Sequence, residues 1–411
     1  MTIKLPALAF RNIFRNLRRS SLSAIAIAVS AMAIIALLAL LECMEADMQT
    51  NLTSYYTGEI RIRHESFEKY ERYNPLHLSL EVKAVLPLVK SVEGIEAATS
   101  RINFPANLYL NGKNNGALGV GVDFANEAAF IDFPSLVTEG RIPQEGKNEL
   151  LIGAILAHEL RLNISDKVTV LTSTALRGSN AMTFEIVGIA SFPVGGLSSK
   201  TLYIPLDRAQ YMLRMEGQTQ EILLQVADGF KEKEVAQEIK NLLSTSLGLE
   251  TETKAWKDLN MMYSFLSIAK FIYYVMAGVF FILGSTAIIN TTMMVVYERM
   301  REIGTLGALG MQGKELTRLF LLEGSFISMA GSTLGTSIGL VIIAILGKVG
   351  LNFTEAMSGM DMEISSILYP QINWWIALFV WFYAIVIATL STLIPSRKAS
   401  KIQIVEALRY V

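Results

Sequence analysis

The chain has 411 residues, of which 52% are hydrophobic and only 18% are charged, and its mean hydropathy is +0.39. An average soluble protein carries about 25% charged residues, so this composition predicts segments that lie in lipid. The net charge of −1 excludes a basic nucleic-acid-binding protein, and the single cysteine, Cys43, excludes an intrachain disulfide framework.

Four uncharged stretches predict four transmembrane helices. The first, Ser21–Leu41, has 21 residues, which at about 1.5 Å per residue cover the roughly 30 Å of a bilayer core. Long buried helices of a soluble protein are the alternative interpretation. This run is too long for a signal-peptide core, and Glu42 stands where lipoprotein processing needs a small residue, so the first helix is expected to remain as an anchor. The other stretches are Phe271–Val296, Gly324–Gly347 and Ile372–Ile394.

Basic residues near the helix ends predict the orientation, because short loops rich in lysine and arginine stay in the cytoplasm. The connection between the third and fourth helices carries Glu355, Asp361 and Glu363 instead and is expected outside. Both termini and the loop 297–318 are therefore expected in the cytoplasm. Their basic residues are Lys4, Arg11, Arg15, Arg18 and Arg19, then Arg299, Arg301, Lys314 and Arg318, and finally Arg397, Lys398, Lys401 and Arg409.

Between the first two membrane helices lie about 220 residues of ordinary soluble character. Alternating strand-like runs occur at 58–64, 106–112 and 116–124, and Asn114-Asn115-Gly116 is a hairpin signal between the last two. A helix is predicted over 79–92, and strand, amphipathic helix and strand over 221–228, 231–247 and 249–256. Four short strands between these halves are "NELLIG", "DKVTVLTS", "MTFEIVGIAS" and "TLYIPL". The pattern predicts a large extracytoplasmic α+β domain with an inserted β-rich subdomain.

No catalytic motif appears in the sequence. His158 opens "HELRL" (158–162), but a zinc-protease helix needs a second histidine where Leu162 stands. A P-loop ending in the Gly-Lys pair at 313–314 would need serine or threonine where Glu315 stands. We therefore predict no catalytic residue, no metal site and no nucleotide bound by this chain.

Two ionisable residues fall near or within the predicted membrane helices. Lys270 lies at the outer end of the second helix, where its stem can reach the interface. Glu323 lies about one turn inside the third helix. A carboxylate at that depth either serves an ion-coupled carrier or, as we favour, is hydrogen-bonded to neighbouring helix ends or to an arginine such as Arg318.

Three glycines, Gly331, Gly335 and Gly339, repeat every four residues on one face of the third helix. Small residues at this spacing let helix backbones approach closely in lipid. Packing within the monomer and packing across a dimer fit the pattern equally well.

The loop between the second and third helices begins with a charged cluster and continues with a helical pattern. Ile303, Leu306 and Leu309 repeat at helical spacing and form one apolar edge, and Gly310 or Gly313 can end the helix. A short helix with small side chains suits insertion into a groove on another protein; an ordinary loop on the membrane surface is the alternative. The charged residues are Glu298, Arg299, Arg301 and Glu302, and the glycines within the pattern are Gly304, Gly307 and Gly310.

These segments resemble a known family. "ERMREIGTLGALGMQGKELTRLFLLEG" (298–324), the glycine-rich third helix and "IPSRKASKIQIVEAL" (394–408) resemble the FtsX-like permease module of ABC transporters. "AFRNIFRNLRRSSLSAIAIAVS" (9–30) resembles its amphipathic entry helix and first span. The outer stretches "EGRIPQEGKNELLIGAILAHELRLNISDKVTVLT" and "FEIVGIASFPVGGLSSKTLYIPLDRAQYML" resemble the periplasmic domain of the MacB and LolC/LolE branch.

The resemblance implies a domain organisation. Residues 1–45 would form the amphipathic helix and first span, 46–262 the MacB-like periplasmic domain, and 263–411 the FtsX-like permease domain. Within the last, it implies the second, third and fourth spans at about 263–296, 316–347 and 372–395, and a coupling helix at about 301–312.

The resemblance also implies partners and a location. The permease would pair with a second permease copy, as a homodimer or a heterodimer, in a bacterial inner membrane, with its large domain in the periplasm. A separate ABC ATPase subunit would bind ATP and Mg²⁺, so this chain would need no cofactor and would be no enzyme. Glu302, Gly304 and Gly310 fall on the coupling-helix pattern, and Glu323 falls on the acidic position of the third helix.

The resemblance implies lipoprotein release from the inner membrane as the first choice of function, driven by mechanotransmission without a tunnel for cargo. Efflux of peptides or small molecules as in MacB, and signalling to a cell-wall hydrolase as in FtsX, are the alternatives. The connection at 172–183 is short and lacks the proline of the family's chaperone-binding hook, which argues against direct recruitment of a periplasmic chaperone or adaptor by this subunit. Lipoprotein entry and a different exported cargo both stay open. Met261, Met262, Tyr263 and Phe265 either line an entry route for hydrophobic cargo from the lipid bilayer or serve interfacial anchoring and packing.

Overall fold

The computed structural model describes residues 5–15, 17–110, 112–259, 261–354 and 364–400. The chain divides into two compact units. The membrane unit comprises Met1–Glu45, Phe265–Leu351 and Leu368–Val411, and the outer unit comprises Ala46–Ser264 and Asn352–Ile367.

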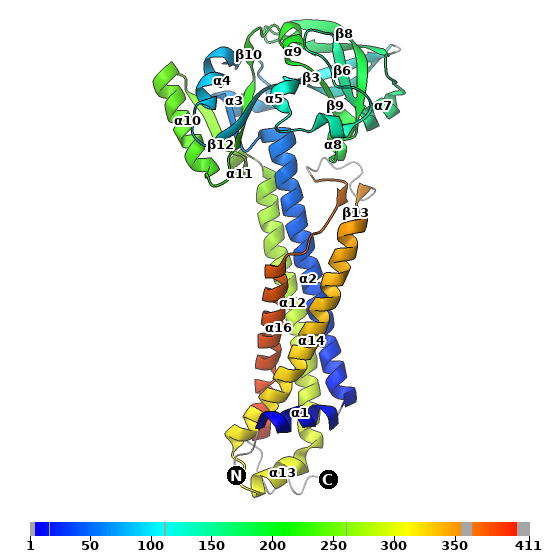
Figure 1. Ribbon diagram of the computed structural model, residues 1–411, viewed down its shortest axis with the longest axis vertical. Helices are drawn as coiled ribbons and strands as arrows, with labels where there is room; N and C mark the ends of the chain where they lie inside the picture. The colour runs from blue at the N-terminus through cyan, green and yellow to red at the C-terminus, as the bar shows by residue number, and fades with distance from the viewer. Residues whose placement is uncertain (1–4, 16, 111, 260, 355–363, 401–411) are drawn as a thin grey trace. The chain divides into compact units, whose positions relative to one another are not determined.

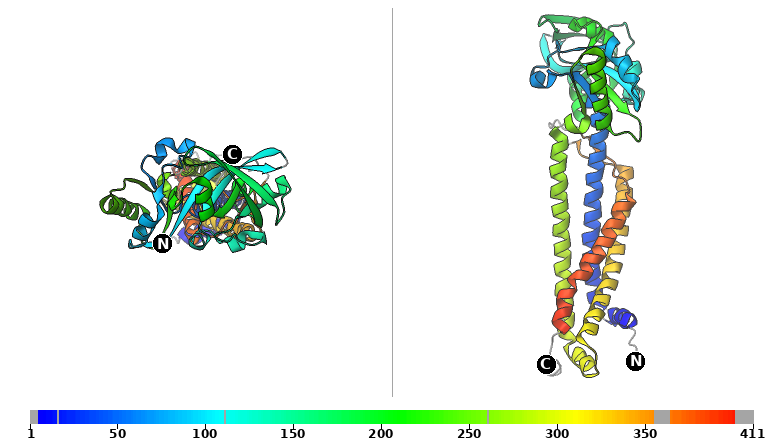
Figure 2. Two further views of the ribbon diagram at one scale, coloured as in Figure 1. Left: turned by 90° about the horizontal axis from the view of Figure 1, so that it is seen from above. Right: turned by 90° about the vertical axis from the view of Figure 1, so that its left-hand side faces the viewer.

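The membrane unit is helical, and its long helices α2, α12, α14 and α16 run side by side (Figures 1 and 2). Among the described residues, four helical segments are long and apolar enough to cross a membrane: Ser20–Thr57, Ile268–Glu298, Gly313–Val349 and Trp374–Ser400. The predicted four-span architecture is confirmed. The helices are α1 (Leu5–Arg15), α2 (Leu17–Asn51), α12 (Met261–Glu298), α13 (Met300–Ala308), α14 (Gly313–Val349), α16 (Trp374–Ser391) and α17 (Leu393–Ser400).

Apolar side chains from all four long helices build the core of this unit. Burying such side chains in close contact replaces lipid contacts by protein contacts of higher density. The buried cluster contains Ala31, Ile34, Ile35, Leu38 and Ala39 of α2, Ala277 of α12, Ile343 of α14, and Ala377, Val380 and Ala384 of α16.

The glycine face of α14 packs against α2 of the same chain. A Cβ atom added at Gly331 would lie 2.6 Å from the carbonyl oxygen of Ala24, and one at Gly335 or Gly339 would collide with Ala28 or Ile35. Side chains larger than hydrogen therefore do not fit at this crossing, and the glycine repeat serves packing within the monomer.

The outer unit alternates short helices and strands. The helices are η1 (Leu52–Thr57), α3 (Phe67–Tyr70), η2 (Glu71–Tyr73), α4 (Val82–Lys90), α5 (Phe124–Glu127), α6 (Phe133–Leu136), α7 (Ala154–Leu160), α8 (Gly195–Lys200), α9 (Leu206–Leu213), α10 (Glu232–Leu247) and α11 (Trp256–Leu259). The strands are β1 (Ile60–His64), β2 (Leu80–Glu81), β3 (Ile95–Leu110), β4 (Lys113–Val122), β5 (Val137–Gly140), β6 (Glu149–Gly153), β7 (Lys167–Ser173), β8 (Ser179–Ala190), β9 (Thr201–Pro205), β10 (Gln218–Thr219), β11 (Glu221–Val226) and β12 (Thr251–Ala255), with β13 (Leu351–Asn352) and β14 (Ile367–Leu368) at the other end of the unit's sequence.

One face of the sheet packs against two helices. Strands β12, β1, β11 and β3 lie side by side, and α4 and α10 cover the face that carries Ile60, Ile62, Ile222 and Leu224. The alternation of these isoleucines with arginines in "IRIRH" places the charged side chains on the opposite face. This is the α+β half that the sequence predicted.

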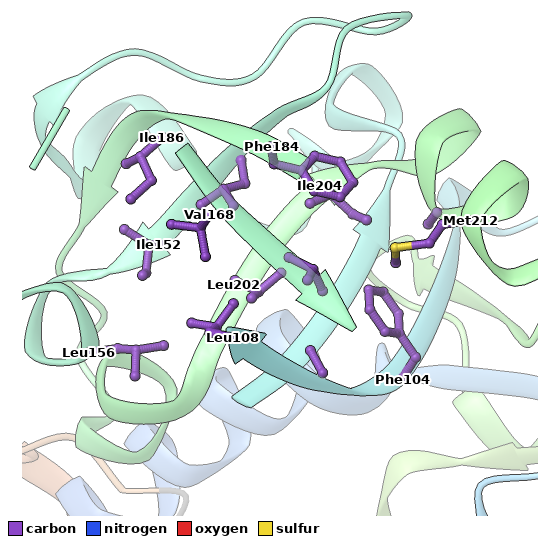
Figure 3. Packing of buried hydrophobic residues seen from close by; sticks show 14 of the residues in the cluster. Phe104, Leu108, Ile152, Leu156, Val168, Phe184, Ile186, Leu202, Ile204 and Met212 are labelled. Carbon is purple, nitrogen blue, oxygen red and sulfur yellow. The ribbon is translucent and has the colours of Figure 1, made fainter. Parts of the chain in front are cut away.

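The β-rich subdomain is a closed ring. Pairings link β3 to β4, β4 to β9, β9 to β6, β6 to β8, β8 to β7, and β7 back to β3. Phe104 and Leu108 of β3 point into its core beside Val168, Phe184 and Leu202 (Figure 3). The long strand β3 belongs to both halves, so the subdomain shares one sheet with the rest of the unit.

The predicted hairpin turn at 114–116 is wrong. Asn114 and Gly116 lie within β4, opposite Tyr109 and Asn107 of β3. The connection is shorter and ends at Gly112, whose φ of +80° suits glycine in a tight turn. The predicted helix over 79–92 begins later than expected, because Leu80–Glu81 pairs with β10 as a strand.

A buried ion pair on the charged sheet face makes the outer unit sensitive to acid. Arg63 donates to Glu221 at 2.8 Å. Burial raises the pKa of Glu221, but Arg63 and Arg61 lower it by more, so the net pKa is lowered. A carboxyl group whose folded pKa lies below its unfolded value of about 4.3 stabilises the fold above that pH, and its contribution is lost as the pH falls further.

We expect amide protection of β1 and β11 in the full chain to fall as the pH drops below about 5, as measured by hydrogen exchange corrected for intrinsic rates. Glu221→Gln should lower protection at pH 6 and flatten this pH profile. Glu238→Gln, at an exposed carboxylate of α10, should keep the wild-type profile. An unchanged profile in Glu221→Gln would contradict the assignment.

Candidate functional site

The loop between α12 and α14 forms a short helix that is bounded by specific local structure. Arg299 separates α12 from α13, and α13 ends at Ala308. The chain then reverses through Gly310, whose φ is +95°. Gln312 and Glu315 cap the start of α14 by a reciprocal pair of side-chain hydrogen bonds. The predicted helix over 301–312 is therefore shorter, Met300–Ala308.

One side of α13 is buried and its tip is exposed. Ile303 packs against Val296, Leu316 and Phe320, and Met300 and Gly304 are also buried. Leu306 is half-buried, and Leu309 is 85% exposed. The predicted apolar edge of Ile303, Leu306 and Leu309 is thus divided, because Leu309 lies beyond the end of the helix. The small residues Gly307, Ala308 and Gly310 flank this exposed leucine at the tip.

Helix α1 lies crosswise near α13 (Figure 1) and is joined to it. Arg15 of α1 forms an ion pair with Glu302 of α13. Both side chains are about half exposed, so the pair contributes at most about 1 kcal/mol of stability. Its location matters more than its strength, since it connects α1 to α13. Arg301 is exposed beside it.

Glu323 is the centre of a buried polar cluster. It accepts a hydrogen bond of 2.6 Å from Asn12 Nδ2 and lies 3.5 Å from Arg299 Nη1. The Arg299 guanidinium also donates to the carbonyl oxygen of Asn12 at 3.2 Å. The expected partner Arg318 is exposed instead. The cluster joins α1, the start of α13 and α14, which the sequence did not indicate.

A small cavity of about 40 Å³ lies beside this cluster. A buried water needs about 10–15 Å³ of such space, so the cavity has room for a few waters and none for a cofactor or cargo. Among the residues that the structure describes, no group of three or more His, Cys, Asp or Glu side chains could hold a metal ion. The polar cavity lining includes Ser20, Ser23, Thr291, Thr292 and Thr392.

The residues proposed for cargo entry, Met261, Met262, Tyr263 and Phe265, lie in the first turns of α12. Their side chains fall outside the described part of the structure, so the entry route stays a prediction. Farther along α12, Lys270 forms an ion pair with Glu45 of α2.

The connection compared above with the chaperone-binding hook is the turn between β7 and β8. Thr174 and Gly178 close it by a backbone hydrogen bond of 2.7 Å, and Leu176 at its tip is 78% exposed. The turn is compact and presents one apolar side chain.

Sequence reasoning missed Asn12 and the joining role of Arg15. Both lie on α1, where Phe10 and Phe14 occupy an apolar face and packing brings Phe10 against Phe326 of α14. The amphipathic pattern of 5–15 was available in the sequence, but the partners are distant along the chain. Such contacts follow from tertiary packing, which local periodicity does not specify.

Two family profiles match the chain. The MacB-like periplasmic core domain matches residues 20–242, and the FtsX-like permease C-terminal domain matches residues 274–404. The first match covers the first membrane helix and most of the outer unit. The second covers α13, α14 and α16 with most of α12.

Three relatives illustrate the range of similar proteins. An ABC transporter permease of Methanocaldococcus jannaschii is 23% identical over 98% of this chain and 96% of its own length. The lipoprotein-releasing system transmembrane protein LolC of Neisseria meningitidis is 21% identical over 79% of this chain and 81% of its own length. The macrolide export ATP-binding/permease protein MacB of Bdellovibrio bacteriovorus is 23% identical over 98% of this chain, which spans 61% of that protein.

Proposed function

Since the chain belongs to the family of FtsX-like ABC transporter permeases with a MacB-like periplasmic core domain, we propose that it couples ATP hydrolysis by a separate subunit to lipoprotein release from the membrane. The observation that carries the coupling role is the exposed tip of α13. The Arg15–Glu302 pair and the buried Glu323 cluster brace this helix from two sides.

The geometry suits transmission of movement. An ATPase that binds the tip of α13 pulls on Ile303 and its contacts in α12 and α14. Chain continuity carries the movement outward, because α2 leads through η1 into β1, and β12 leads through α11 into α12. Two sites are coupled in this way only if both bias one two-state element, and the helix bundle is that element.

Lipoprotein cargo is the finer part of the proposal. Its support is the similarity to LolC, which extends over most of both chains. ATP and Mg²⁺ are assigned to the partner ATPase, and no cofactor is assigned to this chain. A second permease copy completes the complex, and the outer unit faces the periplasmic side.

Affinity purification from native membranes tests the assignment. The tagged chain is extracted gently, and stoichiometric partners are identified by mass spectrometry. We expect an ABC ATPase together with acylated lipoproteins. A cell-wall hydrolase in their place would indicate signalling, and a tunnel-forming adaptor would indicate efflux. The absence of any ATPase, under conditions that preserve other membrane complexes, would contradict the coupling role.

Leu309→Ala is expected to weaken copurification of the ATPase about tenfold or more, because burying a leucine at an interface contributes roughly 1.5–3 kcal/mol. The fold should be unaffected, since Leu309 is already 85% exposed. The matched control is Leu176→Ala, which removes a leucine that is 78% exposed in the outer unit. Equal ATPase recovery with both variants would show that the α13 tip is not the docking point.

A further inference from the structure

The outer end of α2 is held by a buried arginine. Beyond Asn51, the helix continues as the π-helical segment η1 (Leu52–Thr57), and Gly58 then turns the chain into β1. Carbonyl groups in the last turn of a helix have no intrahelical donor. Arg101 of β3 supplies donors to two of them: Nη2 to Ser54 and Nη1 to Tyr55, each at 2.6 Å.

The arginine is fixed in turn by a buried carboxylate. Arg101 is 1% exposed and Glu127 is fully buried. Arg101 Nε donates to Glu127 at 2.7 Å, and Thr99 donates to the other carboxylate oxygen at 2.7 Å. The guanidinium thus binds its counterion and the helix end together, with the planar geometry that lysine cannot reproduce.

A buried ion pair is not needed for stability as such. Replacing such a pair by well-packed apolar side chains is often neutral or stabilising. The value of this pair therefore lies in what else the guanidinium contacts. The neighbouring buried pair on the same sheet face differs in this respect, because Arg63 pairs with the side chains of Glu221 and Glu71.

A second attachment holds the preceding turn of α2. Asn51 Nδ2 donates to Ser365 Oγ at 3.1 Å, and the Ser365 amide donates to Asp47 at 2.7 Å. The helix end is thus held by the sheet through Arg101 and by the segment before β14 through Ser365. Loss of Arg101 is expected to loosen the helix end without releasing it.

We infer that Arg101 is a positioning residue that locks the outer end of α2 to strand β3, so that movement of this helix reaches the shared sheet of the outer unit through β3 as well as through the chain. The lock itself is a property of the outer unit. Its use for transmission rests on the function proposed above.

Spin-label distances test the lock in the full chain in nanodiscs, without nucleotide or ATPase. Labels are placed at Thr50→Cys on α2 and Tyr109→Cys on β3, two exposed positions, in a Cys43→Ser background. We expect a narrow distance distribution in the parent protein, at least a twofold wider one with Arg101→Met, and an intermediate width with Arg101→Lys.

The matched control is Arg63→Met, which breaks the other buried pair on the same sheet face. It should lower the melting temperature and leave the distribution narrow. If Arg101→Met does not fold, Glu127→Gln, which keeps the guanidinium but removes its counterion, should widen the distribution. A narrow distribution in folded Arg101→Met, or equal widening by Arg63→Met, would overturn the inference. Widening without any copurifying ATPase would retain the lock and reject its use in transport.

Discussion

Replacing Gly335 with valine is expected to abolish assembly of the membrane unit. A Cβ atom at this position would come well within 3.0 Å of the carbonyl oxygen, Cα and carbonyl carbon of Ala28. These are backbone atoms, so no side-chain rotation relieves the collision, and α14 has to move away from α2. Overpacking of this kind costs about 3 kcal/mol or more, and the displaced contacts include the buried residues Ile34, Ile35 and Ile343.

The melting temperature of the full chain is measured in detergent. Its monodispersity is measured by size-exclusion chromatography. Gly278→Val is the matched control, because Gly278 lies inside α12 and a Cβ atom there meets nothing within 4 Å. Both changes carry the same difference in helix propensity, so a difference between them reports packing alone. A normal melting temperature for Gly335→Val would contradict the close α2–α14 crossing.

Much of the membrane unit was predictable because its signals are local. An uncharged run long enough to cross a bilayer specifies a helix by itself. The four described spans contain the predicted runs, except that Ile372 and Asn373 precede the fourth span, which begins at Trp374. The glycine repeat marked the close-packed face of α14. Whether that face meets α2 of the same chain or of another depends on tertiary packing, which the repeat does not encode.

The outer unit shows where local patterns fail. The Asn114–Gly116 signal was strong, yet the register of β3 against β4 places these residues opposite Tyr109 and Asn107. Register is set by the whole apolar pattern of two long strands, and this outweighed the preference of three turn residues. The closed ring was also hidden, because it depends on β3 pairing with β7 across some 60 residues of chain.

Glu323 is hydrogen-bonded to neighbouring helix segments and faces an arginine, as expected from the sequence, but that arginine is Arg299 and not Arg318. Arg318 lies five residues before Glu323 on α14, and residues five apart do not share a helix face. Arg318 is therefore exposed, while Arg299 and Asn12 reach Glu323 from the start of α13 and from α1. A cluster formed by three separate segments leaves no periodic signature in the sequence.

Each of the two units contains a buried polar joint between segments that are distant along the chain. In the membrane unit, Glu323 connects α1, α13 and α14. In the outer unit, Arg101 connects η1, the continuation of α2, to β3. Both joints combine a buried charge pair with a hydrogen bond to a main-chain carbonyl, so each fixes the position of a backbone segment.

Arg299→Met is expected to be the most damaging single change at the Glu323 joint. It leaves the Glu323 carboxylate buried, at 8% exposure, with Asn12 as its remaining partner from the cluster. Breaking a buried pair by removing one partner costs about 3–5 kcal/mol, because the remaining charge is uncompensated. The full chain should melt at a markedly lower temperature, and any copurified ATPase should lose its response to the permease.

Two further variants separate the joint from a general effect of charge. Arg318→Met removes an exposed arginine from α14 itself and should change the melting temperature by little. The double variant Arg299→Met/Glu323→Leu removes both charges and should regain most of the stability, since an apolar pair of similar volume replaces a buried ion pair at little cost. Its ATPase response should stay low, because the main-chain contact from Arg299 to Asn12 is also gone. If the double variant recovers both stability and ATPase response, the cluster stabilises the bundle but does not couple α1 to α13.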